Sequence, residues 1–213
     1  MMTTSPPDGL ICPAEAIFDH EDVAVAIAEK IANATSERDI RAATVTVLSA
    51  ARKQGMAAIA TAFCAQPFAS RPTTRAYSWL TDQIVHVVLQ TATQHLHPLP
   101  NPTQGERLSL IAVGGYGRGE MAPQSDVDLL FLTPHKITPW AESVIESMLY
   151  MLWDLKLKVG HASRTVKDCV RLAREDYTIR TSLVEYRHLA GDAKLAKELG
   201  KRLWEELFKS TAS

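Results

Sequence analysis

The sequence has few of the features that would mark a secreted, membrane-bound or disulfide-stabilised protein. Its three cysteines, Cys12, Cys64 and Cys169, stand far apart and form no CxxC pair, which argues against a disulfide framework and a structural zinc site. It has no run of about eighteen apolar residues, and the first twenty residues contain no apolar stretch of signal-peptide length. We therefore expect a cytoplasmic protein without a membrane partner.

An excess of charge of one sign is also lacking. The chain has 213 residues, with 23 Lys and Arg against 24 Asp and Glu, and its formal net charge is −1. The basic residues are scattered, whereas a nucleic-acid-binding protein gathers them into a patch, so a nucleic-acid partner is disfavoured. The length allows one compact domain with a helical appendage, or two small domains.

Hydrophobic patterning divides the chain into four regions. Residues 1–20, rich in Thr, Ser and Pro, are expected to form a flexible tail. Residues 21–72 carry apolar residues at spacings of three and four, which indicates amphipathic helices. Residues 73–168 are expected to form the core, and residues 169–213 a C-terminal helical region that is broken at Gly191.

Prolines are expected to interrupt the helices. Pro67 and Pro72 should separate one helix from a second that Thr73 or Thr74 caps, because proline lacks a backbone donor and restricts the residue before it. Residues 95–104 contain three prolines and are expected to form a loop.

Strands are expected on both sides of a glycine-rich segment. Residues 108–113 and 126–132 are apolar runs typical of buried strands, and residues 157–162 are a third candidate. Residues 138–155 and 165–208 have helical spacing. The predicted fold is α+β: a small mixed sheet of about three to five strands, preceded and followed by helices.

Two acidic residues at the start of the second strand form a candidate metal site. Residues two apart in a strand point to the same face, so Asp126 and Asp128 present both carboxylates on one side. Two such charges repel each other unless a cation neutralises them. Mg²⁺ characteristically takes one or two carboxylates and leaves its other positions to water and phosphate oxygens.

A glycine turn precedes this pair and forms a candidate phosphate site. Gly114 and Gly115 follow an apolar strand, and residues without a Cβ let backbone N–H groups approach phosphate closely. Arg118 adds a nearby cation, although an exposed ion pair is an equally good interpretation of it. Either motif alone is common, since most glycine turns only reverse the chain. Their proximity favours a functional site.

Rival motifs fit less well. A dinucleotide-binding GxGxxG would need glycine where Glu120 stands, and a P-loop would need Gly-Lys-Ser or Gly-Lys-Thr. An aspartyl-phosphate enzyme usually places its DxD after the apolar strand, whereas here the apolar residues 129–132 follow it. The order of strand and acids therefore favours nucleotidyl transfer.

The segment Gly114-Gly-Tyr-Gly-Arg-Gly-Glu120, together with Ser125-Asp-Val-Asp-Leu-Leu130, resembles a known family. It is similar to the uridylyltransferases that modify the nitrogen-regulatory PII signalling protein, within the DNA polymerase β-type nucleotidyltransferase superfamily. Residues 152–165 and 189–192 also resemble that family, so the resemblance runs from about residue 75 to 195.

The resemblance implies transfer of UMP from UTP to a tyrosine hydroxyl of PII, with release of pyrophosphate. It implies one or two Mg²⁺ ions held by Asp126 and Asp128. It also implies triphosphate contacts from Gly114, Gly115 and Ser125, with Arg118 assisting. A different acceptor, or a non-catalytic module that binds nucleotide, is the alternative.

The chain departs from the family pattern in two ways. Many superfamily members carry a third carboxylate on a later strand, but residues 157–162 contain His161 and no acid, which leaves Asp154 and Asp168 as weak candidates. Family members are also longer and carry HD and ACT domains. This chain has no His-Asp dipeptide, so it is expected to be a fragment or a shortened relative without uridylyl removal or glutamine sensing.

Overall fold

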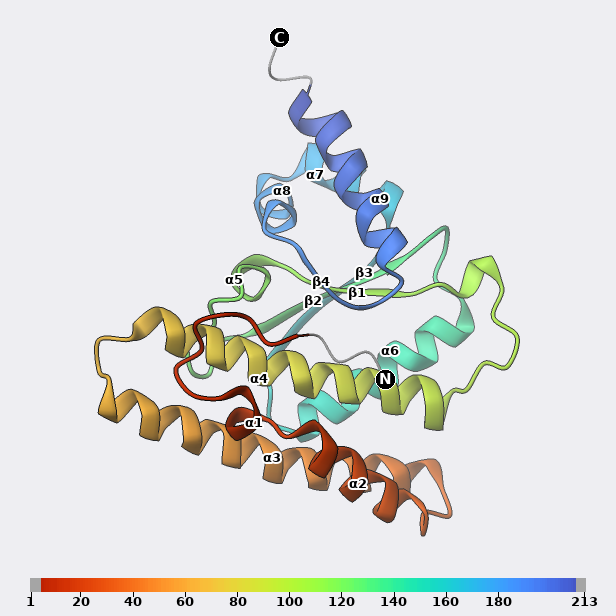
Figure 1. Cartoon of the computed structure of the whole chain (residues 1–213). Coiled ribbons are helices and arrows are strands. Elements are labelled where there is room, and N and C mark those ends of the chain that lie inside the picture. The colour runs from red at the N-terminus through yellow and green to blue at the C-terminus, as the bar shows by residue number, and fades with distance from the viewer. Residues whose placement is uncertain (1–4, 210–213) are drawn as a thin grey trace.

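A four-stranded mixed sheet lies between two layers of helices in the computed structural model, which describes residues 5–209 (Figure 1). The strands are β1 (Ser109–Ala112), β2 (Val127–Thr133), β3 (Val159–Thr165) and β4 (Arg187–Gly191), in the order β3-β2-β1-β4. β1 pairs antiparallel with both β2 and β4, and β2 pairs parallel with β3. The expected α+β fold with a small mixed sheet is confirmed.

The N-terminal helices lie on one side of the sheet; the last of them contacts β4, and the others pack outside it. They are α1 (Ala14–Ile17), α2 (His20–Ile31), α3 (Glu37–Ala65) and α4 (Ser70–Thr91), which continues as the π-helix η1 (Ala92–Leu96). Asp19 and Ser36 accept backbone N–H bonds at the starts of α2 and α3, which satisfies donors that a helix leaves unpaired there.

The structure corrects the N-terminal expectations in two places. Residues 1–4 of the expected tail lie outside the described residues, but residues 14–17 form α1, because Ile17 and Phe18 bury their side chains in the core. The other correction concerns α4, which begins at Ser70, before the expected caps. Pro72 lies in its first turn, where the missing N–H would have had no partner within the helix.

The second half of the chain supplies the other helical layer and α6. Its helices are η2 (Gln104–Glu106), α5 (Gly114–Gly117), α6 (Pro139–Asp154), α7 (Val166–Glu175), α8 (Tyr177–Val184), α9 (Ala193–Leu203) and η3 (Trp204–Phe208). Thr138 caps α6 and Thr165 caps α7. Figure 1 shows α7, α8 and α9 on one side of the sheet and α4 and α6 on the other.

The expectation of helix throughout residues 165–208 is wrong at β4. Ala112 pairs with Arg187 and Ser109 with Gly191, so this segment adds a fourth strand beside β1. It is a short edge strand with little apolar alternation, which hides it from a hydrophobic pattern. One strand of the sheet thus comes from the region expected to be a helical appendage; the domain boundaries themselves stay predictions.

Each face of the sheet belongs to a separate hydrophobic cluster. Leu129 and Phe131 of β2 pack into the cluster that contains α4 and α6, whereas Leu130 and Leu132 pack against α7 and α9. This alternation follows from the strand period of two. Burial on both faces explains why β2 reads as a continuous apolar run.

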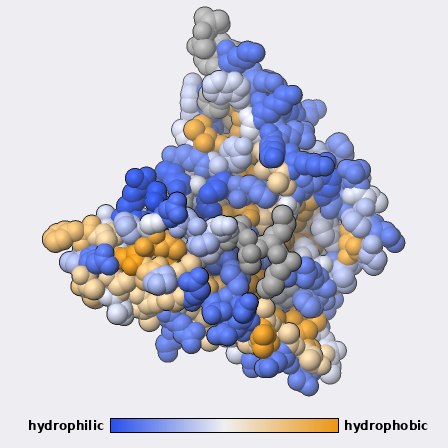
Figure 2. All heavy atoms as spheres, in the orientation of Figure 1, coloured by the Kyte–Doolittle hydropathy of each residue, from blue (hydrophilic) through white to orange (hydrophobic). Residues whose placement is uncertain are grey.

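The outer surface is mostly hydrophilic in Figure 2. Apolar atoms gather at the end where α3 and α4 meet, and the side chain of Phe68 in that connection is 97% exposed. Across residues 5–209, helices that combine the length and the apolar character needed to cross a membrane are absent.

Candidate functional site

The glycine turn leaves the end of β1 and lies against the second acidic residue. Gly114 has a φ of +58°, in the left-handed region where a side chain is strained. A Cβ atom built on Gly114 would lie 3.4 Å from Asp128 Oδ2. The turn and the carboxylate, which are separate motifs in the sequence, therefore meet at one place.

The two acidic residues lie at the start of β2, close to each other. Asp126 is exposed just before the strand, and Asp128 is half-buried. Burial raises the pKa of the Asp128 carboxyl above its ordinary value, and the negative charge of Asp126 raises it further. Among the described residues neither carboxylate has a hydrogen-bond or ion-pair partner. Both oxygens of each group are thus available to a ligand.

Gly160 of β3 provides the surface beneath Asp128. The parallel register pairs Asp128 with Gly160, and a Cβ atom on Gly160 would collide with Asp128 Oδ1. The carboxylate therefore occupies the volume that a side chain would otherwise fill. The sequence reasoning had not singled out Gly160.

A cleft of about 280 Å³ opens between β2, β3 and α8, and we call it the β3–α8 cleft. Gly114 and Asp128 line it at one end, together with Gly160. Its remaining lining comes from Val113, Leu129, Leu130, His161, Ala162, Arg164, Thr178, Ile179, Ser182 and Leu183. The cleft thus reaches from the glycine turn along β3 and beneath α8.

Four predicted site residues lie outside this lining: Asp126, which stands just before β2, and Gly115, Arg118 and Ser125. Arg118 Nη1 donates to Glu185 Oε2 at 2.5 Å in an exposed ion pair, which is the structural interpretation that had been left open for it. A Cβ atom on Gly115 would lie 3.6 Å from Arg118 Nη2. Ser125 lines a separate cavity of about 40 Å³ beside Met121. Their proposed roles in nucleotide binding stay predictions.

Among residues 5–209, no third acid joins the pair. Asp168 closes a capping box with Thr165 at the start of α7, and that hydrogen bond lowers the pKa of its carboxyl. Asp154 is exposed at the end of α6, and neither residue lines the cleft. Within the described part of the chain, no group of three or more His, Cys, Asp or Glu side chains is arranged to hold a metal ion.

A buried polar network anchors the turn from below. Arg187 of β4 donates to both carboxylate oxygens of Asp82 on α4, at 2.7 and 3.1 Å, and to the carbonyl oxygens of Tyr116 and Gly117. The Tyr116 hydroxyl donates to Asp82 Oδ1 at 2.7 Å, and burial raises the pKa of this phenol well above its ordinary value. We call Asp82, Tyr116 and Arg187 the turn clamp.

One signal in the sequence could have revealed part of the turn clamp. Asp82 stands at helical spacing between Trp79 and Leu89, on the apolar face of α4, where a carboxylate must find a partner. Its partner Arg187 lies 105 positions away, and nothing in the local pattern connects the two residues.

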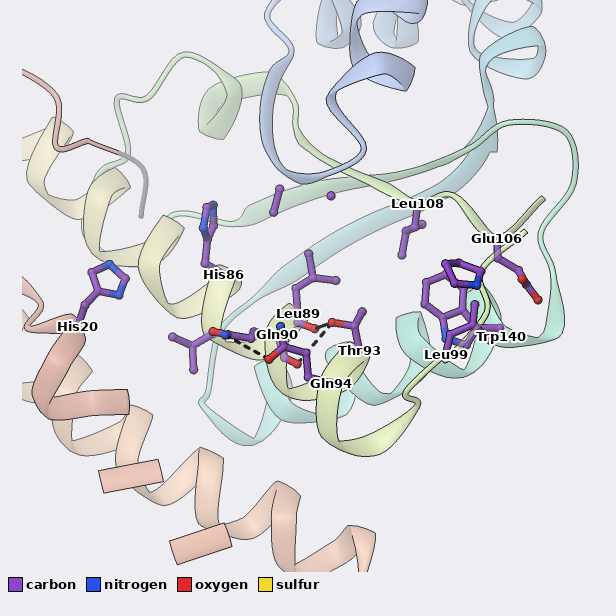
Figure 3. Close-up of a pocket in the computed structure, with 14 residues that line it drawn as sticks. His20, His86, Leu89, Gln90, Thr93, Gln94, Leu99, Glu106, Leu108 and Trp140 are labelled. Atoms are coloured by element: carbon purple, nitrogen blue, oxygen red, sulfur yellow. Dashed lines mark hydrogen bonds between the residues drawn. The ribbon is translucent and has the colours of Figure 1, made fainter. Parts of the chain in front are cut away.

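A larger cavity lies elsewhere. It has a volume of about 560 Å³ and runs from His20 and His86 to Glu106 and Trp140 (Figure 3). It contacts none of the predicted site residues. We therefore take the smaller β3–α8 cleft, which Gly114 and Asp128 line, as the candidate functional site.

The fold and the pairing of a glycine turn with two carboxylates define the chain as a nucleotidyltransferase. The family model described as "Glutamate-ammonia ligase adenylyltransferase" matches residues 10–159, and the chain belongs to that family.

Curated relatives support the narrower resemblance to uridylyltransferases. "Bifunctional uridylyltransferase/uridylyl-removing enzyme" is the name of a protein of Ruegeria pomeroyi that is 59% identical over 195 residues, 92% of this chain and 22% of the relative. A protein of the same name from Cereibacter sphaeroides is 55% identical over 207 residues, 96% of this chain and 22% of the relative. A third, from Rhodospirillum rubrum, is 44% identical over 189 residues, 89% of this chain and 20% of the relative. The chain spans about a fifth of the length of these relatives.

Proposed function

We propose that this chain transfers UMP from UTP to a tyrosine hydroxyl of the nitrogen-regulatory PII signalling protein and releases pyrophosphate. The observation that carries the proposal is the close approach of Gly114 to Asp128, which brings the glycine turn beside a carboxylate, as joint binding of phosphate and metal would require. The names of relatives at 44 to 59% identity favour uridylyl transfer. A cytoplasmic location belongs to the same proposal, because all three cysteines are free.

The donors at the site fit magnesium. Asp126 and Asp128 are close enough for the charge of one to raise the pKa of the other, and their oxygens have no protein partner among the described residues. Carboxylate oxygens are the ligands that Mg²⁺ prefers, so these two residues would hold one or two ions. When bound, the metal supplies positive charge to the triphosphate and to the departing pyrophosphate.

The chain's own residues would act by positioning. Gly114 and Gly115 let the main chain approach the triphosphate, and Gly160 leaves room for the Asp128 carboxylate. The turn clamp fixes the carbonyl groups of the turn through Arg187. In the transfer, a bond would form between the tyrosine oxygen and the α-phosphorus while the bond to pyrophosphate breaks, and the hydroxyl proton would pass to solvent. Rate enhancement then comes from alignment and charge, with no covalent enzyme intermediate.

Adenylyl transfer is the second candidate, because the matching family model is described as an adenylyltransferase. We favour uridylyl transfer because the pairwise identities are high and cover most of the chain. A different acceptor protein, or nucleotide binding without transfer, is the remaining alternative.

Labelled nucleotides distinguish these functions. The chain is incubated with Mg²⁺, purified PII and either α-labelled UTP or α-labelled ATP, and labelled protein is detected after electrophoresis. Label on PII from UTP alone is expected. Label from ATP alone would favour adenylyl transfer, whereas label on another added acceptor would reassign the substrate.

A further inference from the structure

The β3–α8 cleft contains a cation that the sequence motifs did not indicate. Arg164 is the single arginine or lysine among the described residues that line it. Arg118, the cation that the motif suggested, is held by Glu185 outside the cleft. The site therefore has a positive charge, contributed by β3 and not by the glycine turn.

Strand geometry places Arg164 on the same face as Asp128. The register pairs Gly160 with Asp128 and Arg164 with Leu132, and residues at even spacing along a strand share a face. Gly160 and Arg164 lie about 13 Å apart along the strand. The length of the arginine side chain spans part of that distance. Gly160 and Ala162 form a floor of small residues between the two charges, so the cleft has an acidic end and a basic end.

The Arg164 guanidinium has no protein partner within the described residues. It makes no ion pair or hydrogen bond there, although the side chain is half-buried. The neighbouring Asp168 is instead engaged by Thr165 and Arg171. Partial burial of an unpaired cation costs stability, and an anionic ligand would offset that cost.

We propose that Arg164 binds phosphate oxygens of the nucleotide in the β3–α8 cleft. The planar fork of a guanidinium matches two phosphate oxygens, and the carboxylates at the other end would hold the metal that shares the same phosphates. Thr178 and Ser182 of α8 also line the cleft. This inference rests on the proposed nucleotidyl transfer and adds a triphosphate ligand to it.

Calorimetric titration of the whole chain tests the assignment with two probes, UTP and inorganic tripolyphosphate, each in Mg²⁺ and in EDTA. Arg164→Gln is expected to weaken binding of both probes by about 10- to 100-fold, the usual loss for hydrogen bonds to a charged group. Arg164→Lys keeps the charge but loses the fork, and an intermediate loss is expected. Arg171→Gln, an exposed change on α7 outside the cleft, is the matched control.

The outcomes separate this inference from the proposed function. Wild-type affinity in Arg164→Gln overturns the inference. Weaker binding in Arg118→Gln alone would also overturn it, because the phosphate contact would then belong to Arg118, next to the glycine turn. Loss for UTP but not for tripolyphosphate overturns the phosphate contact, because Arg164 would then touch the nucleoside. Weakened binding of both probes, in a chain that labels no acceptor, supports the inference and refutes transfer. Without ligand, the unfolding midpoint of Arg164→Gln is expected to equal or exceed that of wild type, since the substitution removes a half-buried charge that has no ion-pair partner among the described residues.

Discussion

Two glycines decide how closely the main chain approaches the Asp128 carboxylate. Gly114 lies on one side of it with a left-handed φ, and Gly160 lies beneath it in the paired strand. A side chain at either position would contact or displace the carboxylate oxygens. These two positions therefore shape the proposed metal site, although neither glycine can itself contribute a side-chain ligand.

Gly160→Ala is expected to reduce transfer by about 10- to 100-fold, because the new Cβ collides with Asp128 Oδ1 and moves the carboxylate from its place. Steady-state transfer from labelled UTP measures the change. Gly105→Ala is the control, since its Cβ would meet Thr103 Oγ1 at an ordinary 3.6 Å. Undiminished transfer in Gly160→Ala would show that the exact position of Asp128 does not matter.

His86 is expected to make the fold sensitive to mild acid. Burial lowers the pKa of its imidazole, and the charges of His20 and His188 lower it further, while Asp82 and the Leu189 carbonyl oppose the shift. The folded state thus binds the proton less readily than the unfolded chain. The stability that this group contributes is present above the unfolded pKa of about 6.5 and is lost as pH falls through the lower folded pKa.

Urea unfolding at pH 7.5, 6.5 and 5.5 measures this effect, with all three values chosen around the ordinary histidine pKa of about 6.5. We expect the free energy of unfolding to fall toward pH 5.5, and to fall less steeply in His86→Gln. His188, whose pKa burial also lowers, retains part of the slope in that variant. Asp192 and Asp168 do not interfere, because the pKa values of their carboxyls are lowered and lie below this window. Equal slopes in the two proteins would exclude His86 as the cause.

At the scale of elements, the turn clamp joins α4, the glycine turn and β4. Arg187→Met is expected to lower the free energy of unfolding by about 3 kcal/mol, because Asp82 would keep a buried charge without a counter-ion. Tyr116→Phe removes one hydrogen bond and is expected to cost about 1 kcal/mol. Chemical denaturation measures both.

An exposed ion pair provides the control for the clamp. Arg71 pairs with Glu120 at 3.1 Å, with 70% of its side chain exposed, so Arg71→Met should cost well under about 1 kcal/mol. UTP affinity should also fall in Arg187→Met, because the turn loses its two anchored carbonyl groups. If Arg187→Met had the same free energy of unfolding as Arg71→Met, the buried network would not stabilise the fold as expected.

Most elements could be predicted because their causes are local. The break between α2 and α3, the cap of α6 at Thr138 and the apolar run of β2 all follow from residues near them in the chain. β4 could not be predicted because this edge strand of five residues, which begins with Arg187 and His188, shows no clear alternation of apolar and polar residues. Its place is fixed by pairing with β1, which sequence spacing does not encode.

The residues of the candidate site also differ in whether their placement has a local cause. Gly114 and Asp128 could be placed together from motif spacing, since few residues separate the turn from the strand. Gly160 and Arg164 could not, because their role depends on the parallel register of β3 with β2. Arg118 lies inside the motif, but its ion pair with Glu185, 67 positions further along the chain, depends on the fold and could not be predicted from motif spacing.

For the whole molecule, ligand binding is expected to raise thermal stability only when the acidic pair is intact. Mg²⁺ with UTP at about 100 times its dissociation constant should add about 2.7 kcal/mol to the free energy of unfolding, and EDTA should remove the metal-dependent part of that gain. The double variant Asp126→Asn, Asp128→Asn should gain nothing. Differential scanning calorimetry with and without ligand measures the shift.

The double variant also has an expectation without ligand. Removing two like charges that repel each other should leave its unfolding midpoint in EDTA equal to or above that of wild type. A lower midpoint would mean that the carboxylates hold the fold together. Retained stabilisation by Mg²⁺ with UTP in this variant would refute the assigned ligands.

The contact between Asp82 and Arg187 spans 105 positions, and this separation bears on how the protein matures. A ribosome adds the glycine turn and both acidic residues before it adds Arg187, which donates to the carbonyl oxygens of Tyr116 and Gly117 in that turn. Until then the nascent chain carries the complete motif but leaves the Asp82 carboxylate without its counter-ion. An isolated peptide spanning residues 108–133 would contain the whole motif but would lack both Asp82 and Arg187, whose contact holds the glycine turn in the folded chain.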